Sequence, residues 1–197
     1  MRVVMVRHGE TDWNLHRKYL GHTDVPLNQK GYFETAEICE NLLSDLAPLN
    51  GNILIASSDL QRCLYLAKRV QERLHVKTDI IVNKSFREID FGDWEGLTFD
   101  EIQDKYPKQA ALFLKQPNQL LFNGENLEQF SDRIVNGIQN IYNDVKDIHN
   151  INTLLIITHG GVIRVLKSLI HKGTPSDYWQ YSANHGEVFC FEYPYVS

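Results

Sequence analysis

Cysteine is scarce in this chain of 197 residues, and the chain contains no long apolar run. Its three cysteines, Cys39, Cys63 and Cys190, are odd in number and far apart. That pattern excludes a full set of internal disulfides and a paired-cysteine metal site, and it suits a reducing compartment. No apolar stretch approaches the length of a membrane span, and the residues before Arg7 are too few for a signal-peptide core. We therefore expect a cytoplasmic protein with no membrane partner.

Surplus positive charge is also lacking, since the formal net charge is -5. This balance argues against a wide nucleic-acid-binding surface but leaves room for a local cluster of arginines. The composition is otherwise ordinary for a globular protein, with 43% hydrophobic and 23% charged residues. A chain of this length buries a core without disulfides or metals, so we predict a single domain over residues 1–197. Whether the domain forms a homo-oligomer is left open.

Short apolar strands alternate with amphipathic helices along the chain, and the stretch 11–20 is predicted as a polar connection. Strands are predicted at 2–6, 52–58, 79–83, 153–158 and 186–193. Helices are predicted at 32–46, 58–74 (capped by Ser58 or Asp59), 127–147 and 162–171. Nearly continuous apolar strands of this kind are buried on both faces. The prediction is an α/β three-layer sandwich with a mostly parallel central sheet, and with residues 97–126, broken at Pro107 and Pro117, as a small helical excursion that caps a site.

Arginine and histidine residues stand where three of the predicted strands end. Arg7 and His8 follow the first strand, Arg62 lies in the first turn of the next helix, and His159 follows the strand 153–158. The functional crevice of an open parallel sheet lies beyond the carboxyl ends of its strands, where helix N-termini also favour anions. Each residue alone also fits an ordinary turn or surface role. Their shared placement in an acidic protein indicates a phosphate site.

Four sequence blocks carry a resemblance to a known family. They read "RHGET", "SSDLQRCLYLA", "REIDFGDWEG" and "THGGVIR", in that order, and they span most of the chain. The chain resembles the histidine phosphatase superfamily, also called the phosphoglycerate mutase-like superfamily. Two positions depart from the pattern, with Asp59 where proline is common and Leu66 where threonine is common. The resemblance implies a phosphomonoesterase that uses a histidine.

The resemblance assigns His8 as the nucleophile, which forms a phosphohistidine. A neutral imidazole attacks phosphorus when one ring nitrogen is free and the other is held as a donor, here by a nearby backbone carbonyl. Arg7 and Arg62 carry planar, permanently charged forks that suit a phosphate group. By resemblance His159 is a third clamp, and Asn14 contacts the phosphate through its side-chain amide.

The family pattern also selects Glu88 as the acid that protonates the leaving group. The alternative for Glu88 is a salt bridge with Arg87, whereas Asp90, Asp93 and Glu95 fit ordinary loop roles better. The resemblance places further substrate-binding residues at Gly21, His22, Thr23 and Gly160, with Tyr19 and Leu20 at the entrance. No metal and no cofactor are expected, because cationic side chains serve instead. A metal site built from His8, His16 and His22 has no supporting spacing.

The expected partner is a small-molecule phosphate monoester. Between Leu97 and Glu125 the chain has no arginine, which weakens the reading as a mutase, whose substrate carries a carboxylate and a second phosphate. The stretches "GHTDVPLNQKG" and "FGDWEG" are similar to the α-ribazole phosphatase branch and to broad-specificity phosphatases. The prediction is a metal-independent phosphatase, with α-ribazole 5′-phosphate as candidate substrate. The alternatives are a cofactor-dependent phosphoglycerate mutase and a non-catalytic module that binds a phosphate ligand.

Two further departures from the family pattern lie where the substrate is expected to bind. Asn126 stands in "NGEN" where the family usually has serine, and His185 and Gly186 stand in "ANHGEV" in a region that often reads "NxS". Both stretches are expected near the substrate edge of the site, so they bear on the substrate more than on catalysis.

Overall fold

A five-stranded sheet forms the centre of the protein. The computed structural model describes residues 1–46, 53–116, 123–148 and 151–194. The strands are β1 (Arg2–Arg7), β2 (Ile53–Ser57), β3 (Ile81–Val82), β4 (Thr153–Thr158) and β5 (Val188–Glu192), in the order β3-β2-β4-β1-β5. All neighbours pair in parallel except β5, which runs antiparallel to β1. The prediction of a mostly parallel sheet within an α/β fold is confirmed.

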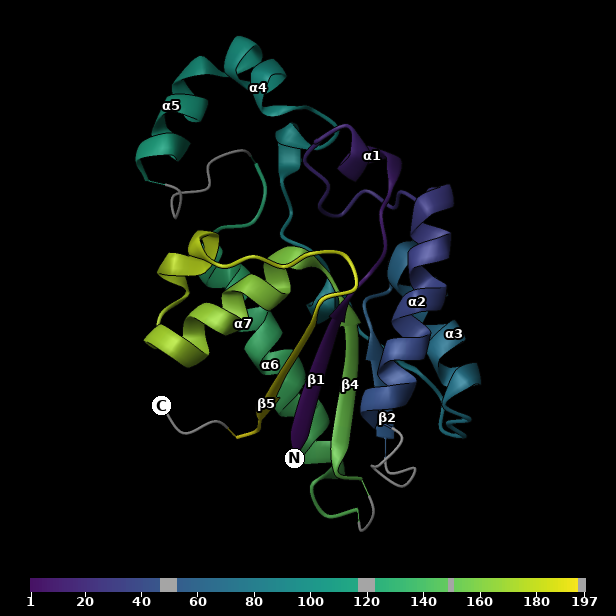
Figure 1. The fold of residues 1–197 in the computed structure, drawn as a ribbon. Helices are drawn as coiled ribbons and strands as arrows, with labels where there is room; N and C mark the ends of the chain where they lie inside the picture. Colours follow the sequence, from purple (N-terminus) through teal and green to yellow (C-terminus); the bar gives the residue numbers. More distant parts are fainter. Residues whose placement is uncertain (47–52, 117–122, 149–150, 195–197) are drawn as a thin grey trace.

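Four long helices cover the two faces of the sheet. They are α2 (Gln29–Leu46), α3 (Gln61–Arg73), α6 (Leu127–Val145) and α7 (Gly160–Lys172). Alternate residues of β1 point to opposite faces, as expected for a strand. Val3 and Met5 pack against α6 and α7, while Val4 and Val6 pack against α2 and α3 (Figure 1). The strand is therefore buried on both sides, which explains its unbroken apolar run.

The prediction that Ser58 or Asp59 caps α3 is wrong. The N-cap is Leu60, whose side chain makes no capping bond. The Gln61 N–H, which has no partner within the helix, donates instead to an Asp24 carboxylate oxygen at 2.8 Å. A loop distant in sequence thus supplies the cap, and the Asp59 carboxylate is available for an ion pair described below.

Short helices lie beyond the carboxyl ends of the parallel strands (Figure 1). Within 97–126 these are α4 (Phe99–Lys105) and α5 (Pro107–Lys115); Pro107 begins α5 at its first turn, a position where proline costs no hydrogen bond. Pro117 lies outside the described residues. The stretch 11–20, predicted as a polar connection, also contains a short helix, α1 (Asp12–Leu15), because Thr11 and Asn14 form a capping box.

The remaining elements are short 3₁₀ turns. They are η2 (Lys84–Phe86), η3 (Gly92–Trp94) and η4 (Pro175–Gln180). Other predicted elements are present with ends shifted by a few residues; for example, the strand predicted at 186–193 forms over Val188–Glu192 only. In the described part of the chain, no helix has the length and apolar character needed to span a bilayer.

Candidate active site

The ends of β1 and β4 bring two buried histidines into contact. The rings of His8 and His159 meet edge to face with centroids 5.0 Å apart. Both are almost inaccessible, at 3% and 1% exposed, and Arg62 from the first turn of α3 is fully buried. Arg7 and Arg62 both act electrostatically on these imidazoles. The four residues predicted at strand ends therefore form one cluster.

The backbone fixes the orientation of the His8 ring. Nδ1 of His8 lies 2.6 Å from the Gly9 carbonyl oxygen, to which it can donate, and Nε2 has no hydrogen-bond partner among the described residues. Burial, then the charges of Arg62 and Arg7, lower the pKa of His8 well below its ordinary value. The ring is therefore neutral at pH 7 with Nε2 available as a nucleophile. A side chain at Gly9 would meet the Gly31 carbonyl oxygen at 2.6 Å, so this turn needs glycine.

Backbone carbonyls, rather than carboxylates, hold the two arginines. Arg62 donates to the carbonyls of Gly21 at 2.7 Å and Thr23 at 2.9 Å, and Arg7 donates to that of Ala183 at 2.6 Å. Neither guanidinium forms an ion pair with any residue that the structure describes. Burial lowers the pKa of both guanidinium groups below the ordinary value for arginine. Arg7 lines the cavity described below, whereas Arg62 is buried behind it; two buried positive charges without an ion-pair partner favour an anionic ligand.

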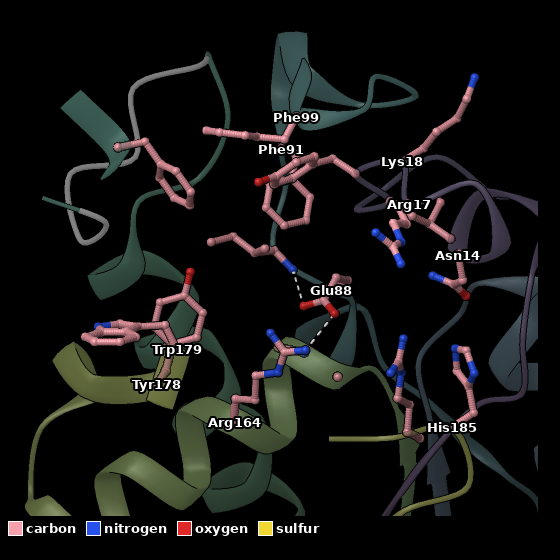
Figure 2. Close-up of a pocket in the computed structure, with 17 residues that line it drawn as sticks. Asn14, Arg17, Lys18, Glu88, Phe91, Phe99, Arg164, Tyr178, Trp179 and His185 are labelled. Atoms are coloured by element: carbon pink, nitrogen blue, oxygen red, sulfur yellow. Dashed lines mark hydrogen bonds between the residues drawn. The ribbon is translucent and has the colours of Figure 1, made fainter. Parts of the chain in front are cut away.

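The Glu88 carboxylate lies at the N-terminus of α7. One oxygen accepts from the Gly161 N–H at 2.8 Å, and the other accepts from the Ile89 N–H at 3.0 Å, as the dashed lines in Figure 2 mark. A Cβ atom on Gly161 would lie 2.1 Å from the Glu88 carboxylate. The alternative of a Glu88–Arg87 salt bridge is wrong, because Arg87 pairs with Asp59. The Glu88 carboxylate is therefore not paired with Arg87, and it lines the cavity described below.

Asn14 presents its amide nitrogen to the same cavity. Its Oδ1 accepts from the Thr11 N–H at 3.1 Å and from the Thr11 hydroxyl at 2.9 Å. These two bonds fix which end of the amide faces outwards, and Figure 2 shows the nitrogen directed to the side of Arg17. The residue is therefore placed to donate to an anion.

Three predicted substrate-binding residues have other surroundings. Gly21 and Thr23 present their carbonyls to Arg62, and the N–H groups of His22 and Thr23 donate to Glu95 at 2.6 and 2.7 Å. None of the three lines the cavity, whereas Gly160 does. The carbonyls of the loop 21–23 thus hold the Arg62 guanidinium, and the Glu95 carboxylate in turn holds the loop.

A cavity of about 630 Å³ adjoins the cluster, of which Arg7 lines its wall while His8, Arg62 and His159 do not. Much of its wall is aromatic or apolar: Tyr19, Leu20, Ile89, Phe91, Phe99, Phe113, Tyr178 and Trp179. Figure 2 shows Phe91 and Phe99 above Glu88, with Tyr178, Trp179 and Arg164 on one side of it and Asn14 on the other. Phe99 and Phe113 belong to the predicted capping segment. The cavity therefore combines an anion-binding floor with an apolar chamber for the rest of a ligand.

Several lining residues were missed by the sequence reasoning. Arg17, Lys18, Arg164, Tyr178 and Trp179 all line the cavity, whereas the lining residue His185 belongs to a stretch that was expected near the substrate edge. Arg164 could have been found, because it follows Gly161 by three positions and so lies on the same face of α7. Tyr178 and Trp179 come from η4, whose approach to the site has no sequence signal.

One cluster has the composition of a cation site. Donor atoms of Glu10, Glu34 and His185 lie within 4.8 Å of one another. The Lys30 ammonium already lies 2.9 Å from Glu10 and 3.4 Å from Glu34, so a positive charge pairs with both carboxylates of this cluster. The arrangement satisfies its carboxylates without a metal ion.

Comparison with known proteins identifies the family. The model of the histidine phosphatase superfamily (branch 1) matches residues 3–195. An uncharacterized phosphatase, PhoE, from Bacillus subtilis is 34% identical over 88% of this chain and 79% of its own length. Phosphoglycerate mutase-like protein 4 from Arabidopsis thaliana is 32% identical over 88% of this chain and 71% of its own.

A solved structure shows the same fold. The α-ribazole phosphatase from Shigella flexneri superposes with a TM-score of 0.83 over 98% of this chain and 90% of its own, at 23% sequence identity. The family model spans almost the whole chain, and the residues of its blocks meet in one cluster at the strand ends. The chain belongs to branch 1 of the histidine phosphatase superfamily and is a phosphatase of that family.

Proposed function

We propose that this phosphatase hydrolyses small-molecule phosphate monoesters, without a metal ion, through a phosphohistidine on His8. The observation that carries the proposal is the state of the His8 ring. Its Nδ1 is engaged by the Gly9 carbonyl, its Nε2 is free, and two arginines without carboxylate partners adjoin it. A neutral, oriented imidazole beside fixed positive charge is what attack on a phosphate dianion requires.

The first step forms the phosphoenzyme. Arg7, Arg62 and Asn14 hold the phosphoryl oxygens, and Nε2 of His8 attacks phosphorus as the ester P–O bond breaks. Glu88, entering as the carboxylic acid, donates its proton to the departing alkoxide. In the second step a water attacks phosphorus and gives a proton to the Glu88 carboxylate. The P–N bond then breaks, and inorganic phosphate leaves with His8 neutral again.

His159 is the third phosphate contact in this proposal. Its Nε2 lies 2.9 Å from the Ser58 hydroxyl, and burial lowers its pKa well below the ordinary value. The ring is neutral in the free protein. A bound phosphate dianion would favour its protonated form and so add a positive charge beside the phosphoryl group.

The aromatic chamber supports a substrate with a planar leaving group. Phe91, Phe99, Tyr178 and Trp179 surround the space next to Glu88 (Figure 2), where the leaving alcohol would lie. Such walls suit the heteroaromatic base of α-ribazole 5′-phosphate, the candidate substrate from the sequence blocks.

We also propose a cytoplasmic location, since Cys39, Cys63 and Cys190 are free thiols.

The test is phosphate release from a panel of monoesters with EDTA present. The panel contains α-ribazole 5′-phosphate, 3-phosphoglycerate, sugar phosphates and 4-nitrophenyl phosphate. We expect turnover that EDTA leaves unchanged, with α-ribazole 5′-phosphate preferred. Interconversion of 2- and 3-phosphoglycerate faster than phosphate release would identify a mutase instead.

The matched variants are His8→Ala and His16→Ala. His16 is exposed and its ring contacts only the backbone of α1. We expect His8→Ala to lose about 1000-fold or more in turnover, and His16→Ala to keep wild-type rates. Strong phosphatase activity in the His8→Ala protein would overturn the mechanism, and silence of the wild type on every substrate would favour the binding-module alternative.

A further inference from the structure

His185 is a second imidazole beside the nucleophile, at a position where the chain departs from its family. Its ring centroid lies 6.2 Å from that of His8, and its side chain lines the cavity. Its Nε2 is buried and has no hydrogen-bond partner among the residues that the structure describes. A buried ring nitrogen without a partner is costly unless a ligand supplies the missing bond.

The loop that carries His185 is fastened to Arg7 at three points. The Arg7 guanidinium donates to the Ala183 carbonyl at 2.6 Å, the Gly186 N–H donates to the Arg7 carbonyl at 3.1 Å, and the Arg7 N–H donates to the Glu187 carbonyl at 3.2 Å. Gly186 has a φ of +70°, a conformation that favours glycine. The imidazole is therefore held in a fixed relation to one of the two arginines of the phosphate site.

Charges on β1 and α2 act on this ring in opposite directions. Burial and Arg7 lower the pKa of His185 to about 4, whereas Glu34 and Glu10 raise it and Lys30 lowers it. The nearest carboxylate oxygen, from Glu34, lies 3.9 Å from Nδ1. In the free protein the ring is therefore neutral at pH 7, with a carboxylate on one side and an open cavity on the other.

A phosphate dianion bound at His8 changes this balance. Two added negative charges close to a neutral imidazole favour its protonated form, and the protonated ring has a donor at both nitrogens. Because the two ring centroids are 6.2 Å apart, an oxygen of a phosphoryl group bound at His8 would come within hydrogen-bond reach of His185. The Glu34 carboxylate would then accept from the opposite nitrogen.

We propose that His185 is a further phosphoryl-binding residue of this enzyme, which takes up a proton when the phosphate dianion binds and donates it as a hydrogen bond to a phosphoryl oxygen. This inference rests on the proposed function of the site. The protonated His185 ring adds a positive charge to the proposed phosphate contacts of Arg7, Arg62 and His159 only while the dianion is bound. The empty site therefore avoids a further buried cation.

The direct test is nuclear magnetic resonance of the histidine ring nitrogens in the full-length protein, with and without inorganic phosphate. We expect the His185 resonances to report a neutral ring at pH 7 in the free protein and a protonated ring with phosphate bound. Assignment uses the His185→Gln variant. Phosphate binding that leaves the His185 ring neutral would overturn the proposal, whether or not the protein is an active phosphatase.

Kinetics give the second test. His185→Ala and His185→Gln should both weaken inhibition by inorganic phosphate. Both should reduce kcat/KM about 10-fold or more for every substrate, regardless of its leaving group. His185→Gln should retain more activity than His185→Ala, because its side-chain amide can still donate a hydrogen bond. The control is His171→Gln, an exposed ring on α7 that stacks on Tyr181. Values within twofold of wild type in both His185 variants would overturn the proposal. Loss of activity in His8→Ala tests the proposed function separately.

Discussion

Arg87 and Asp59 form a two-pronged ion pair that joins two parts of the active site. Arg87 Nε lies 2.6 Å from one carboxylate oxygen of Asp59, and Nη2 lies 2.6 Å from the other. Asp59 precedes Arg62 by three residues, and Arg87 immediately precedes Glu88. The pair therefore fixes the start of α3, which carries Arg62, against the segment that carries the proposed acid Glu88.

A double-mutant cycle on this pair measures its strength. Asp59→Ala, Arg87→Gln and the double variant should show a coupling of about 1–2 kcal/mol in the free energy of unfolding, because the contact is bidentate and only 24% and 17% of the two side chains are exposed. Each single variant should also reduce kcat/KM several-fold. The exposed pair Arg69–Glu72 is the control, with an expected coupling below about 0.5 kcal/mol. A coupling near zero at Asp59–Arg87 would contradict this prediction.

Substitution of Gly161 tests the placement of Glu88. In Gly161→Ala the new methyl group would lie 2.1 Å from the carboxylate, so the carboxylate must move. We expect kcat/KM to fall roughly 10- to 100-fold, a part of what a general acid contributes. The matched control is Gly173→Ala at the other end of α7, where φ is +70° but the space is open. It should lose about 1 kcal/mol of stability and no activity. Wild-type turnover in Gly161→Ala would argue against Glu88 as the acid.

The leaving group should reveal the role of Glu88. Glu88→Gln cannot protonate an alkoxide, so hydrolysis of an alkyl phosphate should slow roughly 100-fold or more. Hydrolysis of 4-nitrophenyl phosphate should slow only a few-fold, because nitrophenolate leaves without a proton. The measurement is kcat/KM for both esters in both proteins. An equal loss for the two esters would show that Glu88 acts by position or charge alone.

Acid should destabilise the protein before its carboxylates titrate. The pKa values of His8 and His159 are held well below 6.5 by burial, and that of His185 is lowered to about 4. The unfolded chain therefore takes up protons first as the pH falls below 6.5, so the free energy of unfolding should decrease between pH 6.5 and about 4.5. Urea unfolding at pH 7.5, 6.0 and 5.0 measures this decrease. His185→Gln should reduce the slope of stability against pH. A stability that is flat, or that rises as the pH falls over this range, would contradict the prediction.

Much of the fold and of the site follows from local pattern. Arg7, His8 and His159 each follow an apolar strand, and the carboxyl ends of parallel strands share one edge of a sheet, so their meeting could be predicted. The glycines after His159 are explained by the same geometry, because Gly161 leaves the space that Glu88 fills. The sequence by itself thus determined which residue types lie at the carboxyl edge of the sheet, because each follows an apolar strand directly.

The tertiary structure alone decided how those residues are held and what surrounds them. Asp24 caps α3 from another loop, and the carbonyls of Gly21 and Thr23 bind Arg62, although the sequence blocks suggested that this loop contacts the substrate. Tyr178 and Trp179 reach the cavity from the far end of the chain. Such contacts join residues tens of positions apart through loops without periodicity, so no local pattern encodes them. They form only when the packed sheet and helices fix where each loop must pass.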